Sequence, residues 1–440
     1  MTKGFAAIPR GGSYVLSNAR LPATLVDGFA AKADADGLVR ASITIADRKV
    51  ARIDAPGRRS TLPKFDMDGG MVWPCFIDMH THLDKGHIWP RQANPDGTFA
   101  GALDAVEKDR RAKWKKADVA ARMDFAIRCA YAHGTALIRT HLDSAAPQHR
   151  ISWPLFAEMR DKWAGKVALQ AVSIVGIDAF RDEKYADKLA DLIADVGGTL
   201  GAVTYPLPDL DRLLEGVMLR AANRNLDLDF HVDETGDPGV NTLRVIADTA
   251  LRTDFPGTIV AGHCCSLATQ DTGEADATMD RVAEAGMAVV SLPMCNMYLQ
   301  GRDGERDTPH WRGVTLVHEL AERGVPVSVA SDNTRDPFYA YGDLDMLEVF
   351  REATRILHLD HPFADWPAVV ARTPATVVRR PEFGVIKAGA SADLVLFRGR
   401  SFTELLARPQ MDRTVLRHGK AIDTTLPDYR ELDAVVGGRR

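Results

Sequence analysis

The sequence predicts an α/β fold: a (β/α)8 TIM barrel with a small β-sandwich domain formed by both chain ends. Eight short apolar segments alternate with helical patterns between residues 70 and 380. This alternation favours a barrel of parallel strands over an open sheet. Residues 1–69 and 381–440 are both rich in alternating apolar residues, and chain termini often lie close together, so we expect them to form one small domain.

The elements follow from the apolar patterns in chain order. The eight barrel strands are expected at residues 72–82, 134–141, 167–174, 200–204, 226–231, 259–263, 288–292 and 326–332. Helices between them are expected at 117–133, 185–196, 209–223, 277–285 and 315–323. Strands of the small domain are expected at 14–16, 23–27, 41–45, 50–53, 392–397 and 413–420.

The composition argues against nucleic acid and membranes as partners. The net charge is −5, and no basic run is present that would follow a phosphate backbone. No run of about 18 apolar residues occurs, and the N-terminal residues 1–5 lead to no apolar signal core. The five cysteines lack CxxC spacing, which is typical of reduced thiols. We therefore expect a cytoplasmic protein, and the sequence leaves open whether it forms a homo-oligomer.

Reactive side chains fall where the expected barrel strands end, which is where barrel active sites are built. His80 and His82 end the first strand, and side chains two apart on a strand face the same way. The other polar endings are His141 and Asp143 on the second strand, His231 with Glu234 on the fifth, His263 on the sixth and Asp332 on the eighth. A single histidine in such a place is usually structural, but five strands with such endings indicate a metal-dependent hydrolase.

Three neutral imidazoles and one carboxylate suit Zn²⁺ or Fe²⁺ and leave a position for water. We predict one divalent metal ion, Zn or Fe, with the ligands His80, His82, His231 and Asp332. Many barrel hydrolases hold a second metal through a modified lysine at the end of the fourth strand. Residues 203–206, which follow that position here, contain no lysine, so a single metal is expected.

Glu234 is the candidate proton shuttle, because water bound to such a metal is acidic near neutral pH and its protons must be moved. It follows His231 by three residues, so we expect it just past the strand end and turned back toward the pocket. An exposed loop carboxylate is the alternative. His263 is expected to hold the attacking hydroxide, with contact to the metal left open, and a structural histidine is the alternative.

Four strings together resemble the motifs of the amidohydrolase superfamily, and specifically its cytosine deaminase group. They are residues 80–85, 231–234, 262–263 and 331–338, and the loop 296–302 with Arg312 and Gly313 is also similar. The match runs in register from about residue 70 to 400. The resemblance implies a deaminase that releases ammonia from cytosine or a related small cyclic amidine, a nucleobase-like molecule. It also implies that Glu234 protonates the ring nitrogen and the departing amine, while Asp332 is both ligand and base.

The resemblance further implies a substrate pocket that contains Gln300, Asn333 and Phe338. Gln300 is expected to contact a ring carbonyl and N–H. Three positions depart from the cytosine deaminases: Val175 and Gly176 stand where a pyrimidine-binding Gln is expected, Asn333 replaces Asp, and Phe338 replaces Trp. An amide both donates and accepts hydrogen bonds whereas a carboxylate only accepts them. We therefore expect the preferred ring to differ from unsubstituted cytosine.

Two alternatives stay open at this point. The first and last strings also resemble the branch that releases an alkylamine from N-substituted aminotriazines such as N-isopropylammelide, although that branch lacks the strand-five motif with Glu. A non-catalytic metal-binding scaffold is the alternative of another class. Such a relative is expected to have lost a ligand or the acid-base Glu, and this chain has all of them.

Overall fold

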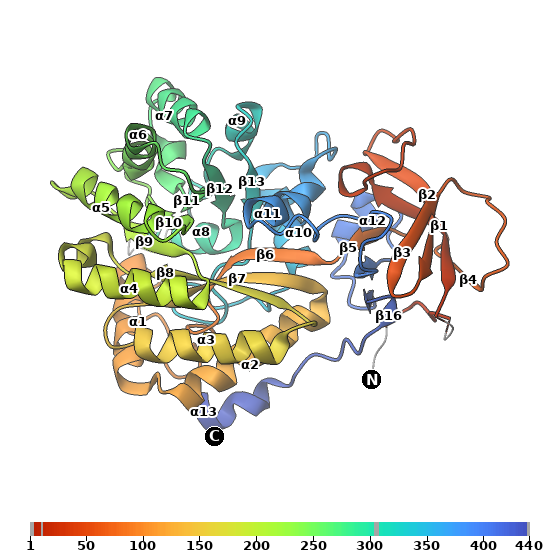
Figure 1. The fold of residues 1–440 in the computed structure, drawn as a ribbon, viewed down its shortest axis with the longest axis horizontal. Coiled ribbons are helices and arrows are strands. Elements are labelled where there is room, and N and C mark those ends of the chain that lie inside the picture. Colours follow the sequence, from red (N-terminus) through yellow and green to blue (C-terminus); the bar gives the residue numbers. More distant parts are fainter. Residues whose placement is uncertain (1–3, 10–11, 303–307, 438–440) are drawn as a thin grey trace.

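Eight parallel strands form the larger part of the computed structural model, which describes residues 4–9, 12–302 and 308–437 (Figure 1). They are β6 (Phe76–Thr81), β7 (Thr135–Asp143), β8 (Ala168–Ile174), β9 (Leu200–Thr204), β10 (Leu228–Val232), β11 (Ile259–His263), β12 (Ala288–Ser291) and β13 (Val327–Val329). These segments are buried almost throughout, and strands buried on both faces read as continuous apolar runs. All eight lie within or beside the segments predicted for the barrel.

The eight strands are hydrogen-bonded as two sheets. β6, β7 and β8 form a three-stranded sheet, and β9 to β13 form a five-stranded sheet in chain order. Isolated parallel bridges connect the two sheets: Val172 with Thr199 and Gly176 with Val203 between β8 and β9, and Thr81 with Asp332 between β6 and the end of β13. The arrangement is therefore barrel-like with the predicted strand order, and the regular ladder is interrupted at two places where we expected one closed sheet.

Helices cover the outer face of these strands (Figure 1). They are α1 (Phe99–Lys113), α2 (Lys116–His133), α3 (His149–Trp163), α4 (Glu183–Val196), α5 (Leu210–Ala222), α6 (Thr242–Thr253), α7 (Thr272–Glu284), α8 (Pro293–Leu299), α9 (Val317–Glu322), α10 (Met346–Leu357) and α11 (Arg372–Val377). Short 3-10 turns are η1 (Ala23–Leu25), η2 (Ile177–Arg181), η3 (Cys265–Thr269), η4 (Trp366–Val370) and η5 (Tyr429–Leu432). The five helices expected from the sequence correspond to α2, α4, α5, α7 and α9.

Helix α4 shows why the sequence folds in this way. The Asp182 side chain accepts hydrogen bonds from the first backbone N–H groups, and Gly197 ends the helix in the left-handed conformation, as is usual for helix caps. Its buried residues recur at the spacing of one helical face: Ala186, Leu189, Ala190 and Ile193. They belong to the apolar cluster that also contains Phe230 of β10 and Val217 of α5.

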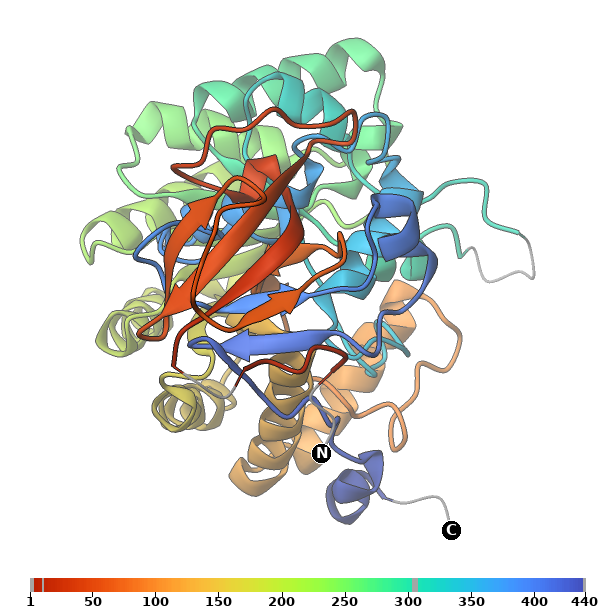
Figure 2. The same cartoon turned by 90° about the vertical axis from the view of Figure 1, so that its right-hand side faces the viewer.

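Two four-stranded sheets form the smaller part, on the right in Figure 1 and facing the viewer in Figure 2. The first contains β1 (Tyr14–Pro22), β2 (Leu38–Ala46), β3 (Lys49–Asp54) and β4 (Lys64–Asp66). The second contains β5 (Val72–Pro74), β14 (Leu394–Leu396), β15 (Thr414–Arg417) and β16 (Lys420–Ala421). Leu16 and Ile43 of the first sheet share an apolar cluster with Leu394 and Leu416 of the second, so both chain ends contribute to one core.

Several boundaries differ from the sequence expectations. The segment 72–82 is two strands separated at Cys75: β5 pairs with β14, and only β6 joins the barrel strands. Because the run is apolar throughout, its periodicity could not reveal the break. Residues 23–27 contain the turn η1 in place of a strand. Residues 1–3, 10–11 and 438–440 of the expected small domain lie outside the described residues, and the partition into domains stays a prediction.

The chain leaves the small sheets after β16 and returns to the larger part. The short helix α13 (Asp433–Val436) belongs to this C-terminal region, whereas α12 (Phe402–Ala407) lies between β14 and β15. Leu432 and Val436 pack against Phe125 and Cys129 of α2, and Figure 1 shows α13 below α2. These last residues therefore cover the larger part of the molecule, whereas we expected them in the small domain.

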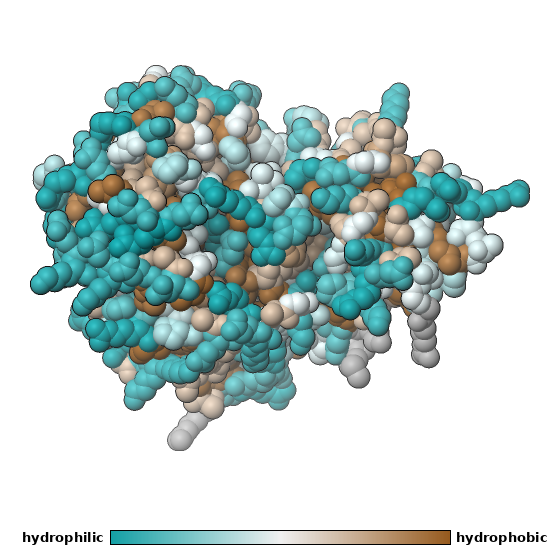
Figure 3. Space-filling view, in the orientation of Figure 1, coloured by the Kyte–Doolittle hydropathy of each residue, from teal (hydrophilic) through white to brown (hydrophobic). Residues whose placement is uncertain are grey.

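The face of the molecule seen in Figure 3 is mostly hydrophilic, with small and separate hydrophobic patches. Within residues 4–9, 12–302 and 308–437, no helix is both long enough and apolar enough to cross a lipid bilayer. All five cysteines are free and buried.

Candidate active site

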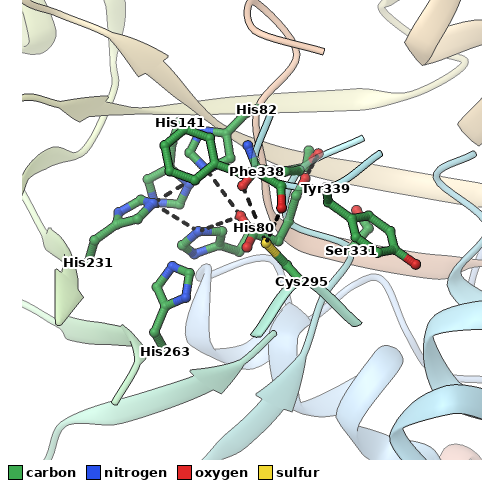
Figure 4. Close-up of polar contacts among 12 residues, drawn as sticks. His80, His82, His141, His231, His263, Cys295, Ser331, Phe338 and Tyr339 are labelled. Carbon is green, nitrogen blue, oxygen red and sulfur yellow. Dashed lines mark hydrogen bonds and ion pairs between the residues drawn. The ribbon is translucent and has the colours of Figure 1, made fainter. Parts of the chain in front are cut away.

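The three histidines predicted as metal ligands, His80, His82 and His231, converge at the C-terminal ends of their strands (Figure 4), and Asp332 lies beside His80 and His82. His231 Nε2 lies 3.2 Å from His80 Nε2 and 3.4 Å from His82 Nε2. Asp332 Oδ1 lies 3.1 Å from His82 Nε2 and 3.7 Å from His80 Nε2. Metal–ligand bonds of about 2.1 Å place tetrahedral neighbours roughly 3.4 Å apart. In these four contacts the side chains have the spacing of ligands around one ion.

The chemistry of these donors fits a divalent cation. Within the part of the chain that the structure describes, both carboxylate oxygens of Asp332 are buried without a hydrogen bond, which is costly for a charged group unless a cation compensates it. Burial lowers the pKa of His80 and of His231 well below the usual value and lowers the pKa of His82 to about 3. The three rings are therefore neutral, which is the form that binds metals.

Asp332 is ionised in this setting. Burial alone would raise the pKa of its carboxyl, but the nearby rings of His82 and His263 hold that pKa well below its usual range. A carboxylate and neutral imidazoles are the combination that suits Zn²⁺ or Fe²⁺.

Backbone hydrogen bonds fix the ligand from the last strand against the ligands from the first. Asp332 follows β13 with φ of 60°, in the left-handed region that few non-glycine residues adopt. Its N–H donates to the His80 carbonyl at 2.8 Å, and Thr81 Oγ1 donates to the Asp332 carbonyl at 2.7 Å. The end of β13 is therefore held directly against the end of β6.

Glu234 is turned into the site by the residue before it. Asp233 has φ of 48°, and its carboxylate accepts the backbone N–H groups of Thr242 at 2.9 Å and Leu243 at 3.0 Å. These bonds fasten the turn after β10 to the first residues of α6. As a result Glu234 Oε1 lies 3.4 Å from His263 Nδ1, and the Glu234 side chain is only 13% exposed. The turn back toward the pocket that the spacing required is present in the structure.

Burial sets the protonation of these two groups. It raises the pKa of Glu234 well above its usual value, and the negative charge of Asp332 adds to the effect. It lowers the pKa of His263 to about 4. Asn296 Nδ2 lies 2.9 Å from His263 Nδ1 and 3.3 Å from Glu234 Oε1. Because an amide N–H can only donate, we assign the His263 ring proton to Nε2.

The Nε2 atom of His263 has no hydrogen-bond partner within the described part of the chain and is buried. The ligand-capable atoms of His263, His80 and Asp332 lie within 4.8 Å of one another. His263 therefore presents a free N–H donor beside the predicted metal ligands.

A cavity of about 910 Å³ opens onto the site. His231, Glu234 and Gln300 line it, together with Phe99 and Tyr205. Gln300 Nε2 donates to the Glu234 carbonyl at 3.2 Å. The structure thus places Gln300, which was expected to contact substrate, in the cavity wall next to the candidate proton shuttle.

The other two expected substrate contacts do not line this cavity. Asn333 Nδ2 donates to Asp336 Oδ2 at 2.7 Å, and Asn333 Oδ1 accepts from Cys295 Sγ at 3.7 Å. Lys85 Nζ lies over the Phe338 ring, 4.5 Å from the ring centroid. Both residues therefore interact with protein groups in the structure, and a substrate-binding role for either stays a prediction.

The sequence analysis named His141 as a polar strand ending but gave it no role, and it missed Asp229. His141 belongs to a group of four buried histidines, with His80, His82 and His231, whose ring nitrogens lie within 4.8 Å of one another. Its Nε2 atom lies 3.3 Å from Asp229 Oδ1. The position of His141 at a strand end was visible in the sequence. The position of Asp229 inside the barrel is known only from the structure. By contrast Asp143, the other polar residue of that strand end, pairs with Arg110 at 2.5 Å.

Lys85, Cys295 and Asn296 were also left without a role. Lys85 and Asn296 lie inside the strings at 80–85 and 296–302, so their positions within these motifs could have pointed to a role in the site. Cys295 is buried, and its sulfur lies within 4.8 Å of carboxylate oxygens of Glu234 and Asp332. Nothing in the sequence separates this cysteine from the other four.

Residues 179–423 match the Amidohydrolase family. The chain is 56% identical over 438 residues to the pterin deaminase of Rhizobium rhizogenes (strain K84 / ATCC BAA-868), covering 99% of this chain and 100% of that protein. The structure is similar to the crystal structure of 5-methylcytosine deaminase from Klebsiella pneumoniae liganded with 5-fluorocytosine. The TM-score is 0.78 at 22% identity, covering 94% of this chain and 98% of that one.

A second solved structure of similar fold is N-isopropylammelide isopropylaminohydrolase from Burkholderia multivorans ATCC 17616. The TM-score is 0.72 at 23% identity, covering 93% of this chain and 98% of that one. At such identities the two structural matches establish the fold alone. They agree with the barrel-like arrangement of β6 to β13.

Proposed function

Because the chain belongs to the amidohydrolase family, as its motifs predicted, we propose that it is a metal-dependent deaminase of a pterin, a 2-amino-4-oxopteridine. The observation that carries this proposal is the 56% identity, over essentially the whole chain, to a protein named pterin deaminase. A pterin contains the cyclic amidine expected from the sequence, fused to a second ring. The proposal therefore keeps the predicted chemistry and replaces the single ring of cytosine by a bicyclic one.

The reaction replaces the 2-amino group by oxygen. The oxygen of water bonds to C2, the C2–N bond breaks, and ammonia leaves with a 2,4-dioxopteridine as the other product. One of the two water protons ends on ammonia, and the other replaces the proton that the enzyme gives to the ring. His80, His82, His231 and Asp332 would hold the metal, which when bound supplies acidification of water near neutral pH.

Glu234 performs the proton transfers in this proposal. Burial keeps its carboxyl protonated, so it can donate to the ring nitrogen beside C2, and the resulting carboxylate then carries a proton to the departing amine. Asp332, which is ionised before the reaction, accepts a proton from the attacking water. The free Nε2–H of His263 donates to the attacking oxygen, and Asn296 fixes that ring through Nδ1 at 2.9 Å.

Product analysis on the purified, metal-loaded protein tests the proposal. Pterin should give ammonia and 2,4-dioxopteridine in equal amounts, followed by a coupled ammonia assay and by absorbance. Cytosine, isocytosine and N-isopropylammelide serve as comparison substrates. Isopropylamine from the triazine with no ammonia from pterin would move the protein to the triazine branch. A protein that binds metal and acts on none of these rings would fit the scaffold alternative.

The remaining expectations stay predictions. The proposal includes one Zn or Fe ion and a small-molecule substrate, with no nucleic-acid or membrane partner, and it leaves open whether the chain forms a homo-oligomer. A cytoplasmic location is part of the proposal, and the five free, buried cysteines support it.

A further inference from the structure

Two glycines near the cavity leave room for aromatic side chains. A Cβ atom added to Gly176, after β8, would lie 2.9 Å from Tyr205 Oη and 2.7 Å from Asp178 Oδ1. A Cβ atom added to Gly236, after β10, would lie 2.7 Å from Cζ3 of Trp311. Contacts under 3.0 Å force a neighbour to move. A Cβ at position 176 would therefore press on Asp178 and Tyr205, and one at position 236 would press on Trp311.

Backbone conformation does not explain these glycines. Gly176 has φ of −57° and ψ of 140°, which any residue adopts, and Gly236 is not among the glycines with positive φ. What each glycine contributes is space. Position 176 is also where the cytosine deaminases were expected to place a pyrimidine-binding Gln, and such a side chain could not coexist with Tyr205 as it stands here.

Tyr205 is held in place from two directions. A parallel bridge between Gly176 and Val203 joins the end of β8 to β9, two residues before Tyr205. The Tyr205 hydroxyl donates to Asp178. These contacts orient the ring, and a rigid ring loses little conformational entropy when a ligand stacks on it.

Tyr205 and Trp311 line the same cavity as His231 and Glu234. Tyr205 comes from the loop between β9 and α5, and Trp311 from the segment before α9. Flat heterocycles stack on such rings whatever their hydrogen-bond pattern. The catalytic carboxyl and two aromatic surfaces are thus available to one bound molecule.

We propose that Tyr205 and Trp311 bind the second ring of a bicyclic substrate, and that Gly176 and Gly236 set this preference by leaving room for them. The proposal rests on the proposed function, because it places the amidine ring at Glu234. Isocytosine, 2-amino-4-oxopyrimidine, has the same amidine as pterin and lacks the second ring. Turnover of isocytosine therefore depends on the catalytic groups and is independent of Tyr205 and Trp311.

The comparison of these two substrates tests the proposal. In Trp311→Ala and Tyr205→Ala, kcat/KM for pterin should fall on the order of 10- to 100-fold, the range for loss of one stacking surface. The value for isocytosine should stay within about 3-fold of wild type. Tyr205→Phe keeps the ring and should keep the preference. Gly176→Ala should reproduce the selective loss, because its Cβ displaces Tyr205.

The matched controls make the same types of substitution, aromatic to Ala and Gly to Ala, at positions away from the two aromatic side chains. Tyr341→Ala removes an aromatic side chain that is 64% exposed and does not line the cavity. Gly273→Ala adds a Cβ that meets nothing within 4 Å. Both should leave the ratio of kcat/KM for the two substrates at the wild-type value. Metal content and melting temperature identify any variant that fails to fold, in which case Gly236→Ala replaces Trp311→Ala.

Equal losses for pterin and isocytosine in both alanine variants would overturn the role of the aromatic pair while leaving the pterin activity intact. No ammonia from pterin with the wild-type enzyme would overturn the proposed function itself. If isocytosine turnover is too slow to measure, inhibition by the two products, 2,4-dioxopteridine and uracil, gives the same comparison.

Discussion

Replacing Glu234 with Gln removes the candidate proton donor and preserves the shape of the side chain. The amide oxygen of Gln can still accept from Asn296, whose Nδ2 lies 3.3 Å from Glu234 Oε1. The metal ligands are untouched, so bound metal and substrate affinity should stay close to wild type. What disappears is the proton that Glu234 would give to the ring nitrogen and the carboxylate that would protonate the departing amine.

The surroundings of Glu234 set the size of the effect. General acid–base catalysis contributes about 10²- to 10⁴-fold. Apart from Glu234, the carboxylates that line the cavity in the described structure are Asp233 and Asp237. Asp233 is committed to the N–H groups of Thr242 and Leu243, and Asp237 is exposed. Because neither can replace Glu234, we expect kcat to fall by about 10³- to 10⁴-fold, or roughly 4–5.5 kcal/mol in activation free energy.

Steady-state kinetics with pterin, together with elemental analysis of bound metal, measures this loss. Burial raises the pKa of Glu234, and the protonated form is the active one. Loss of this proton should therefore lower wild-type kcat as the pH rises through the pKa of Glu234. The residual activity of Glu234→Gln should lack this fall. Glu107→Gln, at a partly exposed position on α1, serves as the control, and kcat within 3-fold of wild type in Glu234→Gln would refute the role.

Three further variants test the ligand set, the orientation of the second histidine and the fold. Asp332→Asn should lower bound metal per chain by at least about tenfold, by elemental analysis, with the fold retained by circular dichroism. Asn296→Ala releases the His263 ring and should lower kcat about tenfold with metal retained; unchanged kcat would argue against the assigned Nε2 proton. Asp345→Asn leaves Arg413, now bound to Asp345 at 2.6 Å, buried without its partner, and should cost about 3–5 kcal/mol in unfolding free energy. Burial would raise the pKa of Asp345, but Arg413 holds it at about 2, below the usual value of about 3.9. Wild-type stability from this pair should therefore be lost as the pH falls from about 4 to 2, and melting curves of Asp345→Asn should lack that loss.

The ligand set was accessible from the sequence because it depends on two local rules. Side chains two apart share a strand face, which groups His80 with His82. Parallel strands of a barrel carry their functional side chains at one end, which brings His231 and Asp332 to the same place. The separations of 3.1–3.7 Å that join His231 and Asp332 to His80 and His82 follow from these rules and from eight strands in chain order.

Other features depend on contacts that no local pattern contains. Cys75 separates two strands because β5 pairs with β14, more than 300 residues later. Asn333 stood out as a departure from the cytosine deaminases, yet its amide is bound by Asp336 and Cys295. Gly176 is explained by Tyr205, in the loop after the neighbouring strand β9, which fills the space beside it. These contacts depend on the folded arrangement, and none is visible in a local sequence pattern.

Three residues that build the site share a backbone conformation that regular strands exclude. Asp233, His263 and Asp332 have φ of 48°, 70° and 60°, and each follows or ends a strand of the barrel. Such conformations cost about 1–3 kcal/mol each and persist where surrounding bonds hold them. Asp and His tolerate this region better than most residues, and so does Asn, which is why Asp332→Asn removes a ligand charge without adding backbone strain. A β-branched residue at position 332 would remove the ligand and strain the turn together, so its loss of metal could not be assigned to the carboxylate.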